Sequence, residues 1–544
     1  MRMRTIPALV VVLITICAMP PGLGAATLLV PGDYPTIQSA IKDAAPGDEV
    51  LVENGIYSGF ENHNLDFLGK AITVRALGSE PGDCVIDCQG GSGEHRAFRF
   101  SGSEGPGSVV AGFTIRNGLA TGGGAIRCET GAAPTITGCV FENNGTHGSA
   151  NGGAIYADSG PTISDCRFEG NRTPGGGGGA IYCESGSPTI TGNTFEGNEA
   201  VYGGALLLRS AVNAQISENR ISASDAVRGG AIYLHVTIGC LINGNVIDNN
   251  LADWGAGIYL EGCQGAAIEG NIISGNKALV YGGAIHAREE CQAELRRNTI
   301  VDNLVSSSLG AGGGLAAGWG STVHVDNCIF WNNSAAIGPA IAALEEPANS
   351  LSIDCSDVDG GQEACAIGPG SSLEWGTGMF DADPMFCNPV EGDYGLDQHS
   401  PCTAEAQPAC GRVGSRDAGC AGQVFSVSLA CVPDSGTLVF QTMMSMDVTN
   451  LCVSQFRRIA GRLDVERADG SMLTYWRHGW LNLPAGTNYA RSWPLLLPPR
   501  PSMVGANTFF LVGEDVTPPP YNLPPYWPAG ETQVDTCTVT ATLP

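Results

Sequence analysis

The sequence predicts an all-β fold built as a parallel β-helix, in which short strands stack coil upon coil. Two observations carry this prediction. A motif first seen as Gly123-Gly124-Ala125-Ile126 recurs about every 27 residues as far as Ile341. A second strand-like segment follows each copy, beginning with Pro134 to Asn144. Neither segment shows the 3.6-residue apolar period of an amphipathic helix, so repeats made of helix pairs are disfavoured.

Each repeat contains three apolar stretches of two or three residues, separated by Gly and Asn. Stretches this short cannot form a stable hairpin alone. Parallel pairing of each stretch with its equivalent one repeat later satisfies the backbone and sets the rungs ~4.8 Å apart. A leucine-rich horseshoe is disfavoured because its leucine frame is missing, and a propeller because its blades need ~40 residues.

One position of the repeat carries Asn or Cys in successive copies, between two apolar residues that should point inward. A tight corner between strands favours Asn, which tolerates a left-handed backbone and can bond to its stacked neighbour. We therefore predict a structural ladder at Cys139, Cys166, Asn193, Asn219, Asn245, Asn271, Asn298 and Cys328.

The composition is that of a compact exported protein. Charged residues make up only 15% of the 544, which argues against disorder, and the net charge of −27 opposes binding to nucleic acid. Arg2 and Arg4 precede an apolar run over residues 8–18, so residues 1–25 are predicted to be a signal peptide. No later stretch is long enough to span a membrane. We expect a secreted or extracellular-surface protein without a transmembrane segment after cleavage.

The domain boundaries follow from where the repeats begin and decay. Residues 26–420 are predicted to form the β-helix with its caps, including an N-terminal capping helix that starts after Pro35 and carries Ile37, Ala40 and Ile41 on one face. Residues 423–544 show alternating stretches bounded by turn signals and predict an immunoglobulin-like β-sandwich.

Nineteen of the twenty cysteines follow the predicted signal peptide, and in an exported chain they predict disulfides. Cys139 and Cys166 occupy successive rungs and are candidates to pair with each other, and Cys263 and Cys291 are a similar pair. Cys431 and Cys537 are candidates to tie the first and last strands of the sandwich. The remaining candidates lie in the segment after the repeats, at Cys387, Cys402, Cys410 and Cys420.

The outward positions of the Gly-Gly-Ala-Ile strand hold the candidate site. If Ile126 and its equivalents point inward, the neighbouring positions point outward. We predict a sugar-binding row at Tyr156, Tyr182, Tyr233 and Tyr259, flanked by Arg209 and His235. Three carboxylates on successive rungs, Glu129, Asp158 and Glu184, are candidates for a calcium site, the one candidate cofactor. A purely structural role, with tyrosines on a sheet face and carboxylates in turns, is the alternative.

Gly-Gly-Ala-Ile paired with Phe-x-x-Asn resembles the repeat of polymorphic outer membrane proteins and related bacterial β-helix proteins. The Phe-x-x-Asn copies are Phe141/Asn144, Phe168/Asn171, Phe195/Asn198 and Phe330/Asn333. The resemblance spans roughly residues 27–420 and implies a right-handed parallel β-helix. Autotransporter members of that family end in a membrane barrel, for which the last ~120 residues here are too short and Pro-rich.

The favoured function is a non-catalytic binding face for glycans or cell-surface partners. Parallel β-helices host polysaccharide lyases and hydrolases, but the paired aspartates and the His-Gly and Arg-x-Lys motifs of those enzymes do not occur together here. Whether the chain is an enzyme is therefore left open, with a non-enzyme favoured. A lyase or hydrolase that uses the Tyr/Glu face is one alternative, and an adhesin is another.

Overall fold

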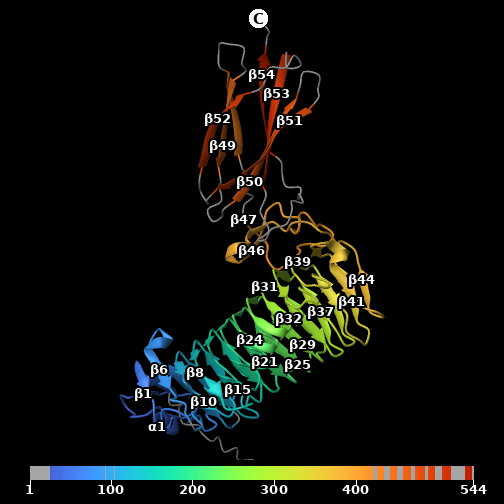
Figure 1. Cartoon of the computed structure of the whole chain (residues 1–544). Coiled ribbons are helices and arrows are strands. Elements are labelled where there is room, and N and C mark those ends of the chain that lie inside the picture. The colour runs from blue at the N-terminus through green and yellow to red at the C-terminus, as the bar shows by residue number, and fades with distance from the viewer. Residues whose placement is uncertain are drawn as a thin grey trace, which may run out of the picture. The chain divides into compact units, whose positions relative to one another are not determined.

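The structure is a computed structural model that describes residues 25–420, except residues 92 and 103, and the backbone of further strands between Ser426 and Ala541. The predicted signal peptide lies outside the described residues, apart from its last residue. The chain divides into two compact units, residues 1–227 and 228–544. Figure 1 shows the strands of each unit stacked side by side along the coils.

The first unit opens on strand β1 (Thr27–Val30) and the short helix α1 (Ile37–Asp43). The Thr36 hydroxyl caps the helix by accepting a hydrogen bond from the Ser39 amide, and Ile37, Ala40 and Ile41 are buried. The predicted helix is therefore present, and it lies against β1, β2 (Glu49–Val52) and β4 (Leu65–Asp66).

Three parallel sheets make up the coils of the first unit, and each strand pairs in register with its equivalent one rung later. Sheet A contains β1, β2, β5 (Thr73–Ala76), β8 (Val109–Ala111), β12 (Thr135–Thr137), β16 (Thr162–Ser164), β19 (Thr189–Thr191) and β22 (Gln215–Ser217). Sheet B contains β3 (Gly55–Tyr57), β6 (Cys84–Asp87), β9 (Thr114–Arg116), β13 (Val140–Glu142), β17 (Arg167–Glu169), β20 (Thr194–Glu196) and β23 (Arg220–Ser222). Sheet C contains β4, β7 (Phe98–Phe100), β11 (Ile126–Cys128), β15 (Ile155–Ala157), β18 (Ile181–Cys183) and β21 (Leu206–Arg209). The short pair β10 (Leu119–Ala120) and β14 (Gly145–Thr146), the 3-10 turn η1 (Pro81–Asp83) and β24 (Asp225–Arg228) complete the unit.

The second unit repeats the same three-sheet plan. Sheet A contains β26 (Leu241–Asn243), β30 (Ala266–Glu269), β34 (Gln292–Arg296), β38 (Thr322–Asp326), β41 (Ser350–Asp354) and β44 (Ser372–Trp375). Sheet B contains β27 (Val246–Asp248), β31 (Ile272–Ser274), β35 (Thr299–Val301), β39 (Ile329–Trp331) and β42 (Asp357–Val358). Sheet C contains β25 (Ile232–His235), β29 (Ile258–Glu261), β33 (Ile285–Arg288), β37 (Leu315–Ala317), β40 (Ile341–Ala343) and β43 (Cys365–Ile367). A side sheet contains β28 (Leu251–Trp254), β32 (Lys277–Tyr281) and β36 (Leu304–Val305), and the 3-10 turn η2 (Gly361–Ala364) precedes β43.

The core is a set of stacked apolar columns, as the repeat predicts. Ile126 pairs with Ile155, which pairs with Ile181, and all three side chains are fully buried. The rings of Phe141 and Phe168 stack with their centroids 4.7 Å apart, and Phe195 continues the column. Equivalent side chains therefore lie above one another, so the described coils form a parallel β-helix.

The predicted ladder positions are hydrogen-bonded from rung to rung within each unit. The Asn193 amide donates to Asn219 Oδ1 at 2.9 Å, and the Asn245 amide donates to Asn271 Oδ1 at 2.9 Å. Asn271 bonds to Asn298 in the same way, and the Asn298 amide lies 3.4 Å from the Cys328 sulfur. The Phe-x-x-Asn asparagines form a further ladder, in which Asn144 Nδ2 donates to Asn171 Oδ1 at 3.0 Å.

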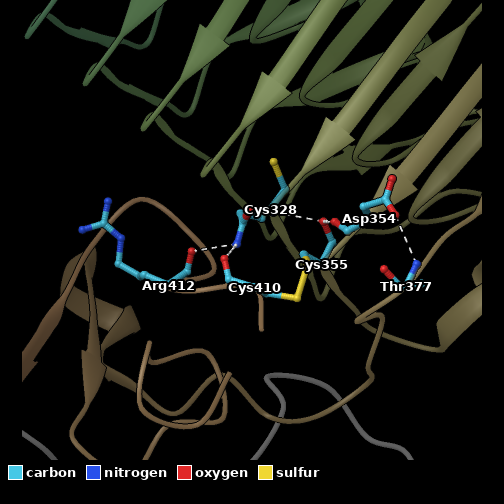
Figure 2. The surroundings of a disulfide bond; sticks show 8 residues. Cys328, Asp354, Cys355, Thr377, Cys410 and Arg412 are labelled. Atoms are coloured by element: carbon cyan, nitrogen blue, oxygen red, sulfur yellow. Dashed lines mark hydrogen bonds between the residues drawn. A yellow bond between two sulfur atoms is a disulfide. The ribbon is translucent and has the colours of Figure 1, made fainter. Parts of the chain in front are cut away.

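A disulfide holds the segment that follows the last coils. Figure 2 shows the Cys355–Cys410 bond, with Asp354 accepting a hydrogen bond from the Thr377 amide at 3.1 Å. The segment contains β45 (Phe386–Asn388), the 3-10 turn η3 (Pro389–Glu391), β46 (Asp393–Asp397) and β47 (Ala418–Cys420), and its Leu396, Cys402 and Val413 pack on Ile329 of β39. Of the predicted disulfide candidates, Cys410 and Cys387 are disulfide-bonded. Cys410 pairs with Cys355, which is not one of the predicted candidates.

Other cysteine candidates are thiols in the structure. Cys139, Cys166, Cys263, Cys291 and Cys402 are free and buried. The members of each stacked pair are nonetheless close. The Cys139 amide lies 3.4 Å from the Cys166 sulfur, and the Cys263 and Cys291 side chains are within hydrogen-bond reach of each other. Their bridging stays a prediction. The side chains of Cys420, Cys431 and Cys537 lie outside the described residues.

The strands beyond residue 420 form two antiparallel sheets. One contains β48 (Ser426–Pro433), β49 (Gln441–Thr449) and β52 (Asn488–Leu496). The other contains β50 (Arg457–Glu466), β51 (Met472–Leu483), β53 (Gly505–Asp515) and β54 (Gln533–Ala541). Antiparallel strands are therefore present between Ser426 and Ala541, while the immunoglobulin-like sandwich packing stays a prediction.

Candidate functional site

The predicted tyrosine row lies in register on sheet C, but most of its rings are buried. Tyr156 pairs with Tyr182, and their rings stack with centroids 5.3 Å apart. Tyr233 pairs with Tyr259, whose ring is turned edge-on at 5.0 Å. Tyr182, Tyr233 and Tyr259 are 2%, 5% and 0% exposed. These three rings therefore cannot serve as an open sugar-stacking platform, which corrects the prediction for them.

The three predicted calcium ligands are already engaged by protein groups. Glu129 accepts a 2.7 Å ion-pair contact from Arg99. Asp158 accepts a 2.6 Å hydrogen bond from the Tyr156 hydroxyl, and Glu184 accepts one from Tyr182. No group of three or more His, Cys, Asp or Glu side chains within the described residues is arranged to hold a metal ion. Calcium stays a prediction, and its proposed ligands would have to leave these partners to bind it.

The two flanking residues of the predicted row have different surroundings. Arg209 Nη1 lies 3.6 Å from Glu184 Oε1, so it joins the first-unit network of tyrosines and carboxylates. His235 lies beside the Tyr233 ring, with centroids 5.8 Å apart. Each of the two side chains therefore contacts a neighbouring member of the row.

The second unit contains a denser network around Tyr259. The Tyr233 hydroxyl donates to Glu261 Oε2, and Arg228 Nη1 lies 3.5 Å from the same carboxylate oxygen. The Arg228 guanidinium carbon lies 5.6 Å from the ring centre of Trp254 and 5.9 Å from that of Tyr259. Arg228 and its neighbours therefore cover the tyrosines, which explains why the outward row is buried here.

A second arginine and tryptophan pair lies on the other side of Tyr259. The Arg288 guanidinium carbon lies 4.3 Å from the ring centre of Trp319. Trp319 Nε1 donates to Glu345 Oε1 at 3.2 Å, and the other carboxylate oxygen lies 3.3 Å from His286 Nε2 and 3.8 Å from Arg288 Nε. Glu345 thus joins three side chains and fixes the orientation of the Trp319 ring.

The pKa shifts follow from this burial and pairing. Burial raises the pKa of Tyr259 to about 12, although the positive charges of Arg228 and Arg288 oppose the rise. Burial also lowers the pKa of His286, which outweighs the attraction of Glu345. The pKa of Glu345 is lowered because its bonds to His286 and the charge of Arg288 outweigh its burial. His286 is therefore neutral at pH 7, while Glu345 is ionised.

We define the Arg–Trp face as Arg228, Trp254, Arg288 and Trp319, supported by Glu261 and Glu345. Trp319 is 42% exposed, whereas the two arginines and Trp254 are half-buried. Sequence reasoning places Glu261 and Arg288 on the outward face but misses the two tryptophans, because they lie outside the repeated strand motif: Trp254 precedes Gly255-Ala256-Gly257-Ile258, and Trp319 follows β37. The sequence signal that could have revealed this face is a tryptophan in one repeat next to an arginine in the adjoining repeat.

Comparison with known proteins supports the fold. A family model described as a right handed beta helix region matches residues 86–237, 175–330 and 230–356. No curated protein matches the sequence. Within the described residues, no helix has the length and apolar character needed to cross a membrane.

Two solved structures are similar. One is a mannuronic acid specific polysaccharide family 6 lyase enzyme from human gut microbiota, at 16% identity and a TM-score of 0.30, covering 72% of this chain and 96% of that one. The other is the enzymatically active domain of tailspike protein 4 from bacteriophage CBA120, at 9% identity and a TM-score of 0.17, covering 86% of this chain and 62% of that one. Similarity at this level assigns no activity or ligand. Residues 86–356 are thus, by family model as well as by their coils, a right-handed parallel β-helix.

Proposed function

We propose that this chain is a secreted or surface-displayed β-helix protein that binds a glycan at the Arg–Trp face without cleaving it. The single observation that carries the proposal is the Arg288–Trp319 contact, in which a guanidinium lies 4.3 Å from the centre of a partly exposed indole ring. The ring is held from behind by the Trp319–Glu345 hydrogen bond. A rigid, half-open aromatic ring beside fixed polar groups is the arrangement that amphipathic ligands require.

The polar groups around the Trp319 ring can form hydrogen bonds with the hydroxyl groups of a sugar. A pyranose has apolar C–H faces that stack on an indole, and hydroxyl groups that bond to planar charged side chains. Arg288 and Glu345 provide donors and acceptors beside Trp319, and Arg228 and Glu261 provide a second set beside Trp254. Charge-assisted hydrogen bonds of this kind are about twice as strong as neutral ones. The two sets together offer more than one sugar subsite.

The same network argues against catalysis. A general acid or base must come within hydrogen-bond reach of the bond that it acts on. Of the groups here that could transfer a proton, Tyr259 and His286 are 0% and 1% exposed, and the carboxylates of Glu261 and Glu345 lie in ion pairs with Arg228 and Arg288. The Tyr233 hydroxyl is occupied by Glu261. The most exposed group of the face is the indole of Trp319, which can bind a ligand but is a poor acid or base.

The proposal is tested by screening the full chain on a glycan array, with and without calcium, and assaying retained glycans for cleavage products. Trp319→Ala is expected to weaken the retained glycan about 10-fold, as the loss of one stacked ring. Phe60→Ala is the matched control, because Phe60 is 87% exposed and lies in the first unit. Product formation would favour the lyase or hydrolase alternative, and binding to cells but to no glycan would favour the adhesin.

The calcium arm tests the predicted metal site separately. Glu129, Asp158 and Glu184 belong to the first unit, whereas the groups that define the Arg–Trp face belong to the second. If calcium raises glycan binding and the triple substitution of these residues by Ala abolishes that effect, the first-unit carboxylates take part in binding. If binding is the same with calcium and with chelator, the Arg–Trp face acts alone, as we propose.

A further inference from the structure

We infer that the ligand of the Arg–Trp face is an uncharged glycan rather than a polymer of uronic acids. This inference rests on the proposed function and names the substrate class of the same site. Its basis is the charge balance of the face. Each arginine of the face already lies beside a carboxylate: Arg228 is 3.5 Å from Glu261, and Arg288 is 3.8 Å from Glu345.

The remaining groups of the face add no positive charge. Neutral His286 donates from Nε2 to the Glu345 carboxylate at 3.3 Å and is 1% exposed, so an added proton would be buried. Tyr233 and Tyr259 are neutral donors, and the tryptophans carry no charge. Two guanidinium groups against two carboxylates leave the face close to neutral. A uronate carboxylate therefore finds no cation that is not already paired.

Capture of a uronate would break one of these pairs. The Glu261 side chain is 9% exposed, and it holds both the Tyr233 hydroxyl and Arg228. If Arg228 turned to a ligand carboxylate, Glu261 would stay behind as a buried charge that has lost its cation, which is strongly unfavourable. The net charge of −27 acts in the same direction, since it repels a polyanion before contact.

Binding of a neutral sugar does not require an ion pair of the face to break. Its hydroxyl groups can donate to the free lone pairs of Glu345 and accept from the outer N–H groups of Arg288 while the ion pair stays closed. Arg288 lies over the Trp319 ring, and the 42% exposure of that residue leaves part of the ring for the C–H face of a pyranose. The face thus suits a ligand rich in hydroxyl groups and free of charge.

The test compares two ligand sets by calorimetry on the full chain: neutral oligosaccharides of glucose, xylose and mannose, and oligomers of mannuronate and galacturonate. We expect neutral oligosaccharides to bind, with less than a twofold change in affinity between low and high salt. Uronate oligomers are expected to bind at least 10-fold more weakly. Tight, salt-sensitive uronate binding that Trp319→Ala abolishes would overturn this inference and leave the proposed function standing.

A variant that removes the carboxylate partner of Arg228 provides an independent test. Glu261→Gln keeps the shape of the side chain but releases Arg228, so we expect uronate affinity to rise at least 10-fold while neutral-sugar affinity changes little. Glu269→Gln is the matched control on β30, outside the face. If Glu261→Gln leaves uronate affinity unchanged in a folded variant, charge balance does not set the preference. If neither ligand set binds the wild-type chain at Trp319, the proposed function itself fails.

Discussion

Glu345 accepts a hydrogen bond from Trp319 Nε1 at 3.2 Å, so a half-buried carboxylate fixes the plane of the exposed ring on this β-helix. The same side chain contacts His286 and Arg288. Strand β33 supplies these two residues, Trp319 follows β37, and Glu345 lies just after β40. Three successive rungs are therefore tied together through one side chain. The stacking of the coils is what brings residues from positions 286 to 345 into one site.

Glu345→Ala is expected to lower stability and loosen the Arg–Trp face. The change removes the acceptor for Trp319 and the partner of Arg288 and His286, and leaving partly buried polar groups unpaired costs about 2 kcal/mol. Urea unfolding measures the loss, and glycan binding should weaken along with it. Glu374→Ala on β44 removes an exposed carboxylate and is the control, with an expected effect within about 0.5 kcal/mol. Equal effects of the two substitutions would contradict the role given to Glu345.

Stability should fall in mild acid because of His286. Burial lowers the pKa of this histidine, so the unfolded chain takes up its proton at a higher pH than the folded chain does. The full stability is therefore present above about pH 6.5, the ordinary histidine value, and declines as the pH falls below it. Thermal unfolding followed from pH 8 to pH 5 measures this decline.

The groups that face His286 are Glu345, Arg288 and Glu261, and its ring lies against Tyr259 and Tyr281. His286→Gln should flatten part of the decline, whereas His324→Gln on β38 should leave it intact. The pKa of His63 is also lowered by burial, so a residual slope is expected in the His286 variant. An unchanged slope in His286→Gln would mean that this imidazole is not a source of the acid sensitivity.

Asn271→Ala should cost about 2–3 kcal/mol of folding free energy. Asn271 is fully buried, its Nδ2 donates to Ile242 O at 2.9 Å and to Asn298 Oδ1 at 3.0 Å, and its Oδ1 accepts from Asn245. The substitution leaves these groups unpaired in the interior. Asn243→Ala on the same corner, where the side chain is half-buried, is the control. Similar losses at both positions, measured by urea unfolding, would show that the ladder adds no more than a surface amide.

The repeat predicted the fold because it is periodic, and because the burial of each apolar residue depends on the equivalent residues in the neighbouring repeats. Ile126, Ile155 and Ile181 lie in register and buried where the motif places them. The site could not be predicted in the same way. The sequence indicates that Tyr259 points out of the sheet, but its burial depends on Arg228 and Trp254, which reach it from another strand. The Cys355–Cys410 bond spans 55 residues of irregular chain and has no repeat to reveal it.

The stacked thiol pairs are expected to close as disulfides under oxidising conditions. The hydrogen bond from Cys291 lowers the pKa of Cys263 to about 7, so Cys263 is the thiolate that attacks. Oxidised glutathione would take up the two hydrogens of each pair and leave as two reduced molecules. Because Cys263 is buried, the reaction should be slow and proceed through local opening of the rungs.

Peptide mapping by mass spectrometry without reduction identifies the bridges. We expect Cys139–Cys166 and Cys263–Cys291 linkages, whose stacked positions lie ~4.8 Å apart, within the range that a disulfide spans. Cys128 and Cys183 are the internal control, because they lie two rungs apart, ~9.6 Å. A Cys128–Cys183 bridge, or persistent free thiols at the stacked pairs after full oxidation, would contradict the prediction.

Hydroxyl-radical footprinting of the full chain, with and without a retained neutral oligosaccharide, tests the binding claim most directly. The account predicts that bound glycan protects Trp319 from oxidation, while the exposed Phe60 reacts at an unchanged rate. Protection confined to the first-unit tyrosine row, or none at Trp319 while the glycan is bound, would contradict it.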